Sequence, residues 1–171
     1  SRTRDMHVCT YQIDLRQSEE AIWGKFRGSV RTEVRRAEKK GVTLECQEPA
    51  ADLDAFCALY ASLASEGKGA SYEPRFFSEV YGRFSPGGQV RIFNAYYQGK
   101  PVATAFVSFY GDRAEPMWTA KLSLDDDIGC NQFIVWQSIL WGKKMGYAWY
   151  DFGGVPPNKD ELPGIHFYKK S

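Results

Sequence analysis

The chain has 171 residues and a mass of 19.4 kDa, the size of one domain or of one compact lobe of a larger enzyme. Hydrophobic residues make up 43% and charged residues 25%, which excludes disordered and fibrous classes. The net charge is only +1, so the molecule as a whole has no electrostatic attraction for nucleic acid or an anionic membrane. A local patch of basic residues is still compatible with this net charge. We expect no DNA partner.

The sequence also gives no support for a membrane-spanning, a secreted or a metal-binding protein. No apolar run reaches the length of a membrane helix, and the polar start shows no secretory signal. The cysteines lie far apart and form no metal-ligand pattern with the two histidines; they are Cys9, Cys46, Cys57 and Cys130. We therefore expect buried, reduced thiols, no metal, and a cytoplasmic location.

Residues 7–15 alternate in polarity and predict a half-buried strand. Ser18, followed by two glutamates, is typical of a helix start, and Gly41 of a helix end. The apolar residues between them recur at steps of three or four, at Trp23, Phe26, Val30, Val34 and Ala37. This spacing predicts a single long basic amphipathic helix over residues 18–40.

The rest of the chain predicts a regular succession of elements. In order, these are a short strand at 42–47, a helix from 53 that stops at Gly67, a helix at 74–84, strands at 89–97, 101–110 and 113–122, a helix at 131–145 and a strand at 147–152. The tight turns near Gly99 and Gly111 predict an antiparallel meander. The helix at 131–145 is apolar on nearly every side, so we expect it to be packed from both sides.

This order of elements is similar to the N-acetyltransferase-like (GNAT) arrangement. We therefore predict an α/β (α+β) fold, a mixed sheet with flanking helices, preceded by an extra strand and the long helix. Residues 1–41 would form the linking strand and helix, and residues 42–171 the GNAT-like lobe.

A GNAT enzyme that uses acyl-coenzyme A needs a glycine-rich turn after the fourth strand, where backbone N–H groups cradle the pyrophosphate. Here that turn, residues 122–130, has one glycine and three consecutive acids at Asp125, Asp126 and Asp127. Carboxylates repel a pyrophosphate, so we expect no coenzyme A site and no other cofactor.

Four segments carry a more specific pattern, at residues 23–42, 91–103, 131–154 and 164–170. The first ends Val34-Arg-Arg-Ala-Glu-Lys-Lys-Gly-Val42, the third ends Gly146-Tyr-Ala-Trp-Tyr-Asp-Phe-Gly-Gly154, and the last reads Gly164-Ile-His-Phe-Tyr-Lys-Lys170. In this order they resemble the FemABX peptidyltransferases, which use aminoacyl-tRNA to add amino acids to the peptide of peptidoglycan precursors. Tyr168 departs from the phenylalanine that is usual in that family.

The resemblance implies a transferase that moves an aminoacyl group from aminoacyl-tRNA to an amine of a UDP- or lipid-linked peptidoglycan precursor. Members of the family have two GNAT-like lobes, and this chain matches the second, so we expect a missing N-terminal lobe and an inactive isolated fragment. Peripheral membrane contact fits a lipid-linked acceptor. Two alternatives stay open, namely a GNAT-like acyltransferase with another donor in polysaccharide or lipid modification, and a non-catalytic lobe that binds tRNA or precursor.

The resemblance also assigns site residues. Lys169 would stabilise the developing oxyanion, with the Tyr168 ring holding the acceptor end of the tRNA. Arg75, preceded by Tyr72, would bind the diphosphate of the acceptor at the start of a helix. For Lys169 and Arg75 the alternative is a solvated surface cation.

Two features have competing interpretations from the residues themselves. Asp151 could orient the attacking amine or accept its proton, or it could cap the turn at Gly153. Arg31, Arg35 and Lys39 share one helix face, which is either a solvated face with intrahelical ion pairs or a patch for RNA or a phosphorylated substrate.

Overall fold

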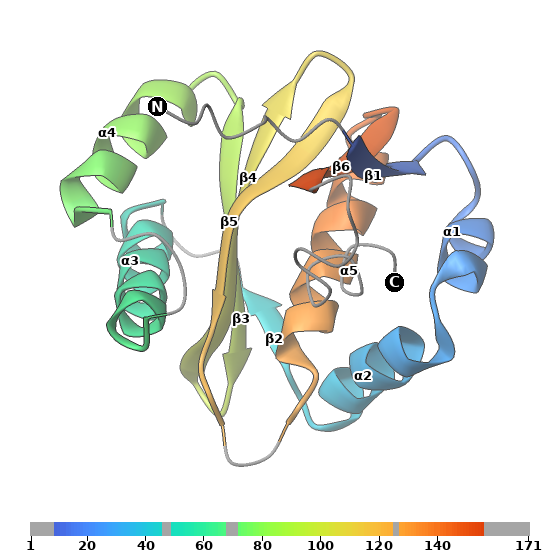
Figure 1. Ribbon diagram of the computed structural model, residues 1–171, viewed down its shortest axis with the longest axis horizontal. Coiled ribbons are helices and arrows are strands. Elements are labelled where there is room, and N and C mark those ends of the chain that lie inside the picture. Colours follow the sequence, from blue (N-terminus) through green and yellow to red (C-terminus); the bar gives the residue numbers. More distant parts are fainter. Residues whose placement is uncertain (1–8, 46–48, 68–71, 125–126, 156–171) are drawn as a thin grey trace, which may run out of the picture.

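A computed structural model describes residues 9–45, 49–67, 72–124 and 127–155. Its centre is a six-stranded sheet of order β1-β6-β5-β4-β3-β2 (Figure 1). The strands are β1 (Cys9–Asp14), β2 (Thr43–Glu45), β3 (Val90–Tyr97), β4 (Lys100–Tyr110), β5 (Arg113–Lys121) and β6 (Trp149–Val155). Every neighbouring pair is antiparallel except β5 and β6, which are parallel. The mixed sheet and the antiparallel meander are thus confirmed.

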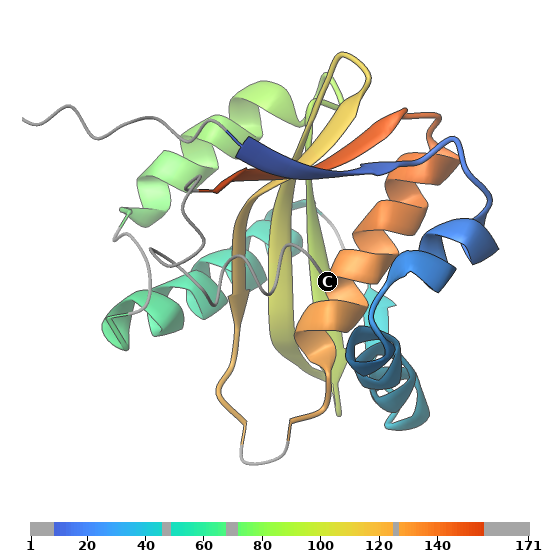
Figure 2. The same ribbon diagram turned by 45° about the vertical axis from the view of Figure 1, so that its right-hand side comes forward.

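Helices cover both faces of this sheet (Figures 1 and 2). They are α1 (Glu19–Lys25), α2 (Gly28–Lys39), α3 (Pro49–Ser65), α4 (Pro74–Phe84) and α5 (Cys130–Lys144). The α3 and α4 helices pack on one face around Phe56, Phe77 and Phe106. On the other face α5 lies against the strands, and α1 and α2 contribute buried side chains to the same core.

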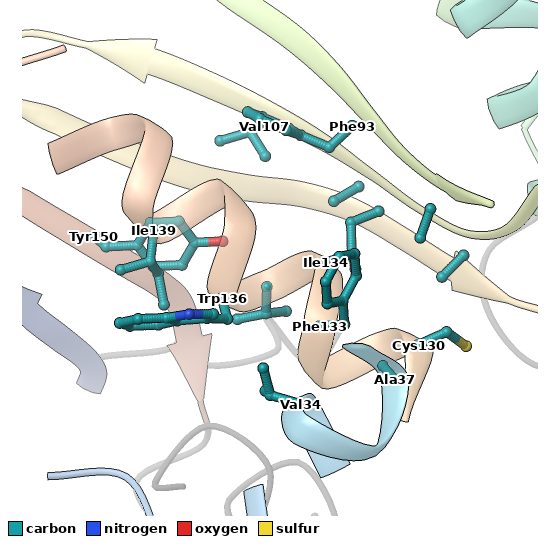
Figure 3. Packing of buried hydrophobic residues seen from close by; sticks show 14 of the residues in the cluster. Val34, Ala37, Phe93, Val107, Cys130, Phe133, Ile134, Trp136, Ile139 and Tyr150 are labelled. Atoms are coloured by element: carbon teal, nitrogen blue, oxygen red, sulfur yellow. The ribbon is translucent and has the colours of Figure 1, made fainter. Parts of the chain in front are cut away.

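The α5 helix is packed from both sides, as its apolar sequence predicts. Figure 3 shows Val34 and Ala37 of α2 beside it, with Phe93 and Val107 of the sheet across from them. All four side chains are fully buried. They belong to one cluster with the buried side chains of α5, so α5 joins the sheet and α2 into one core. Burial of a valine or phenylalanine side chain contributes roughly 1.5–3 kcal/mol to this core.

The long helix predicted over residues 18–40 is wrong, because the structure breaks it into α1 and α2. The backbone is extended at Phe26 (ψ 146°) and Arg27 (ψ 149°), and α2 begins at Gly28. The extended backbone accompanies burial of the Phe26 ring, which packs edge-to-face on Trp136 with centroids 5.7 Å apart. Gly24 and Gly28 flank the break and weaken a continuous helix, since glycine costs about 1 kcal/mol relative to alanine there.

The first strand lies at the edge of the same sheet. Its residues pair with β6 in antiparallel fashion, for example Ile13 with Tyr150. Residues on both sides of position 41 therefore share one sheet and one core, while the division of the chain at that position stays a prediction.

Candidate functional site

The parallel strands β5 and β6 diverge after a short contact. Only Arg113 with Trp149 and Ala114 with Tyr150 are paired among the described residues. Beyond that point β5 contains a β-bulge: Phe106 of β4 pairs with Trp118 but Val107 pairs with Pro116, which leaves Met117 as an extra residue. Figure 2 shows β1 and β6 running across the direction of the long central strands. In open α/β sheets, ligands bind where strand ends separate in this way.

Asp151 lies on β6 at this divergence, and the residue is only 8% exposed. It accepts hydrogen bonds from the Thr10 hydroxyl, from Gln12 Nε2 at 2.7 Å and from the backbone N–H of Gly153 at 2.9 Å. The guanidinium of Arg113 lies 3.4 Å away. The Gly153 contact is the one that the turn-capping interpretation expects.

These donors decide the ionisation of Asp151. Burial alone would raise the pKa of its carboxyl, but the hydrogen bonds from Thr10, Gln12 and Gly153, together with Arg113, outweigh burial and lower the pKa. The carboxylate is therefore ionised at neutral pH and is a weak proton acceptor. Its geometry suits holding a cationic or N–H group of a substrate, or tying β1 to β6.

We expect Asp151→Asn to lower the free energy of unfolding by about 1–3 kcal/mol at pH 7, because an amide cannot accept from all of these donors. A carboxyl with a lowered folded pKa stabilises the protein above its unfolded pKa of about 3.9, and that stability is lost as the pH falls through the folded value. The difference between wild type and variant should therefore shrink below about pH 4, as measured by urea unfolding across pH. Asp112→Asn is the matched control, since that carboxylate is 61% exposed. A constant difference from pH 7 to pH 3 would contradict the assignment.

Tyr72 and Arg75 lie at the start of α4. Arg75 is 86% exposed and forms an ion pair with Glu79 at 2.8 Å. Tyr72 stacks on Phe76 with centroids 5.0 Å apart, and both rings meet Trp118 of β5 edge-on. We call Tyr72, Phe76 and Trp118 the aromatic platform; it adjoins a pocket of about 290 Å³ lined by Tyr60 and Phe77 among others.

The platform and Asp151 lie on the same side of the sheet. Tyr150 and Phe152 point into the core around α5, so alternation along β6 directs Asp151 to the face that carries α3 and α4. No hydrogen bond or ion pair joins Arg75 to Asp151 among the described residues. Lys169 and Tyr168 lie outside the described residues, so their assigned roles stay predictions.

The amino end of α5 differs from the phosphate cradle of a GNAT enzyme that uses acyl-coenzyme A. Gly129 has φ +72°, and a Cβ atom built on it would lie 2.2 Å from the backbone oxygen of Glu33 in α2. Its N–H is bonded to Asp127 Oδ1 at 3.1 Å. The α2 backbone thus packs directly on Gly129, immediately before the first residues of α5. No sequence signal pointed to this contact.

The charge at this end of α5 is also unfavourable for a phosphate. Burial and the neighbouring Asp127 raise the pKa of Glu33, and Arg36 only partly offsets them. Two carboxyl groups and a backbone carbonyl therefore face the helix start. The residues present do not fit the pyrophosphate of coenzyme A.

Among the described residues, no three His, Cys, Asp or Glu side chains are grouped so that they could hold a metal ion. None of the described helices has the length and apolar character needed to cross a membrane.

Three solved structures with similar folds are each 17% identical to this chain or less, so they show the fold alone. FemX matches with a TM-score of 0.82 and 15% identity, covering 94% of this chain and 57% of FemX. The C-terminal domain of a putative lysylphosphatidylglycerol synthetase from Agrobacterium fabrum matches with a TM-score of 0.60 and 16% identity over 94% of this chain and 51% of that one. L-PGS from Bacillus licheniformis matches with a TM-score of 0.62 and 17% identity, covering 87% of this chain and 45% of L-PGS. The chain spans about half the length of these proteins.

Comparison of sequences gives the family directly. No curated protein matches the chain. A family model described as an acetyltransferase (GNAT) domain matches residues 24–170. The fold is that of a FemABX-like GNAT lobe, as the four sequence motifs predicted, and the chain belongs to the acetyltransferase (GNAT) domain family.

Proposed function

We propose that this acyltransferase lobe takes an aminoacyl group from aminoacyl-tRNA and transfers it to an amine of a UDP- or lipid-linked peptidoglycan precursor. The observation that carries the proposal is the closed amino end of α5, where the Glu33 carbonyl packs on Gly129. Because an acidic turn and the α2 backbone crowd this helix start, a pyrophosphate fits poorly there and a different acyl donor is favoured. The FemX-like fold and the four motifs support aminoacyl-tRNA as that donor.

The reaction is aminolysis of an ester. The acceptor amine attacks the ester carbonyl, a C–N bond forms, the C–O bond to the tRNA breaks, and the 3′-hydroxyl leaves with a proton. Lys169 would stabilise the negative charge that develops on the carbonyl oxygen, and Tyr168 would hold the acceptor end of the tRNA beside it. Because its lowered pKa makes Asp151 a poor base, we assign it to orienting the amine.

The acceptor would lie across α4. The exposed guanidinium of Arg75, at the start of α4, offers two parallel N–H donors to a diphosphate. Tyr72 exposes 42% of its surface and presents a flat ring next to it. A ring of this kind packs well against a sugar or base attached to the diphosphate.

The test follows the mass of the acceptor. The complete protein is incubated with a peptidoglycan precursor and either charged tRNA or acetyl-coenzyme A, and the acceptor is examined by intact-mass spectrometry. We expect the mass of one aminoacyl residue to be added with charged tRNA and no acetylation with acetyl-coenzyme A. Calorimetric titration should likewise show no binding of acetyl-coenzyme A.

Three results would count against the proposal. Low-micromolar binding of acetyl-coenzyme A with acetyl transfer would support the alternative of an ordinary acyl donor. Aminoacylation of a phosphatidylglycerol headgroup in place of the precursor would move the acceptor to the lipid class. Binding of both substrates without any transfer would indicate a non-catalytic lobe.

A further inference from the structure

The α2 helix carries a cluster of cations that the proposed chemistry does not use. We call Arg31, Arg35, Arg36 and Lys39 the α2 basic face. Arg35, Arg36 and Lys39 are exposed, and Arg31 is half-buried. Residues at i, i+4 and i+8 of a helix lie in one row with about 6 Å of rise at each step, so Arg31, Arg35 and Lys39 form a linear array.

The structure positions these guanidinium groups without neutralising them. Arg31 Nη1 donates to the carbonyl of Gly24 at 3.1 Å, and Arg36 Nη1 donates to the carbonyl of Asp127 at 3.1 Å. The guanidinium of Arg35 lies over the ring of Trp23, 5.6 Å from its centroid. Each contact uses part of a group that has five N–H donors, and the rest are left for a ligand.

The competing interpretation is a solvated face whose cations are held in intrahelical ion pairs. None of Arg31, Arg35 and Arg36 forms an ion pair with a carboxylate among the described residues. Glu33, which lies on the same helix, has a raised pKa because it is partly buried and close to Asp127. In the part of the chain that the structure describes, the three guanidinium groups are therefore not held in ion pairs with carboxylates and keep N–H donors for an anionic ligand.

The place of the α2 basic face matters as much as its charge. The same helix closes the amino end of α5 through the Glu33 carbonyl. Arg36 binds the loop that leads into α5. The α2 basic face thus lies on the helix that packs on the start of α5, and its side chains, rather than the helix N–H groups of α5, are available to phosphates.

We propose that the α2 basic face binds the phosphate backbone of the RNA that carries the acyl group, with Trp23 and Arg35 as a stacked pair available to an unpaired base. The inference rests on the proposed function, since it gives the tRNA donor a place to dock. An anionic membrane is the less favoured partner. Along residues 19–39, all of which are described, no large apolar side chain is exposed to enter a lipid surface.

The experiment uses an RNA hairpin with the sequence of a tRNA acceptor arm and no attached amino acid. Its binding is measured by fluorescence anisotropy over a range of salt concentrations. The double variant Arg35→Gln/Lys39→Gln removes two cations from the face. Each lost phosphate contact lowers the slope of log K against log salt by about 0.7–0.9, so we expect the slope to fall by about 1.5 and affinity at 0.1 M salt to fall about tenfold or more. Arg83→Gln/Lys144→Gln, which removes two exposed cations from α4 and α5, should leave binding unchanged.

Equal loss of affinity in both double variants, or no RNA binding by the wild type, would overturn the proposal. So would binding to vesicles of phosphatidylglycerol and phosphatidylcholine that depends on Arg35 and Lys39 while RNA binding does not. Because the RNA hairpin carries no amino acid, its binding is measured independently of acyl transfer. Failure of the proposed function can therefore be distinguished from failure of this docking surface. α2-dependent RNA binding without transfer to any acceptor would refute the function alone, and transfer that is insensitive to the variant would refute this docking surface alone.

Discussion

Gly129→Ala is expected to lower the free energy of unfolding by about 2–5 kcal/mol. The residue has φ +72°, and the left-handed region costs a residue with a Cβ atom about 1–2 kcal/mol. The added Cβ would also lie 2.2 Å from the oxygen and 2.8 Å from the carbonyl carbon of Glu33. Since both are backbone atoms of a packed helix, relief requires α2 to shift away from α5, and overpacking of this kind costs roughly 1–3 kcal/mol more.

Gly146→Ala separates the two causes. Gly146 follows the other end of α5 with φ +85°, and a Cβ atom there would have nothing within 4 Å. Urea unfolding of both variants should give a loss of about 1–2 kcal/mol for Gly146→Ala and at least twice that for Gly129→Ala. If the two variants lose the same stability, α2 does not close the amino end of α5, and the argument against coenzyme A loses its main support.

Lys169→Ala, in the complete protein, is expected to lower kcat about 10²–10³-fold with little change in KM for the acceptor. A cation that acts on the oxyanion formed during the reaction contributes to the rate and hardly to ground-state binding. Lys170→Ala removes the same charge one residue away and is the matched control. Wild-type turnover of Lys169→Ala at saturating charged tRNA would refute the assignment.

Arg75→Ala should have the opposite kinetic signature. If Arg75 binds the diphosphate, its loss raises KM for the phosphate-bearing acceptor and leaves a dephosphorylated analogue nearly unaffected. Arg83→Ala, at the other end of α4, tests for a nonspecific effect of charge. Because Arg75 is 86% exposed, its variant should keep its stability to within about 0.5 kcal/mol. Equal KM changes in the two arginine variants would remove Arg75 from the acceptor site.

Local signals in the sequence were enough to predict the order and type of the elements, apart from the division of residues 18–40 into α1 and α2. The turn between β3 and β4 is one such signal, and Gln98 and Gly99 both take positive φ angles there, at 51° and 74°. The apolar composition of residues 131–145 likewise predicted a helix covered on both sides, because a helix that is apolar on nearly every side must be buried on nearly every side. The fold class and the resemblance to the FemABX family follow from such patterns in combination.

The candidate site depended on contacts that no local pattern encodes. The donors to Asp151 on Thr10 and Gln12 lie 141 and 139 residues away in sequence, and they meet it only because β1 pairs with β6. A buried network that ties α3 to the sheet, through Asp52, Asn94 and Thr104, is of the same kind.

The sequence by itself determined most of the elements, their order and the acidic turn that disfavours a phosphate. Only the tertiary structure decided that the helix breaks at Phe26, whose ring is buried against Trp136, and that Glu33 closes the start of α5 at Gly129. The physical reason is that helix periodicity and turn residues act over a few positions. Burial of a ring, or the close approach of two backbones, depends instead on which distant segments pack together.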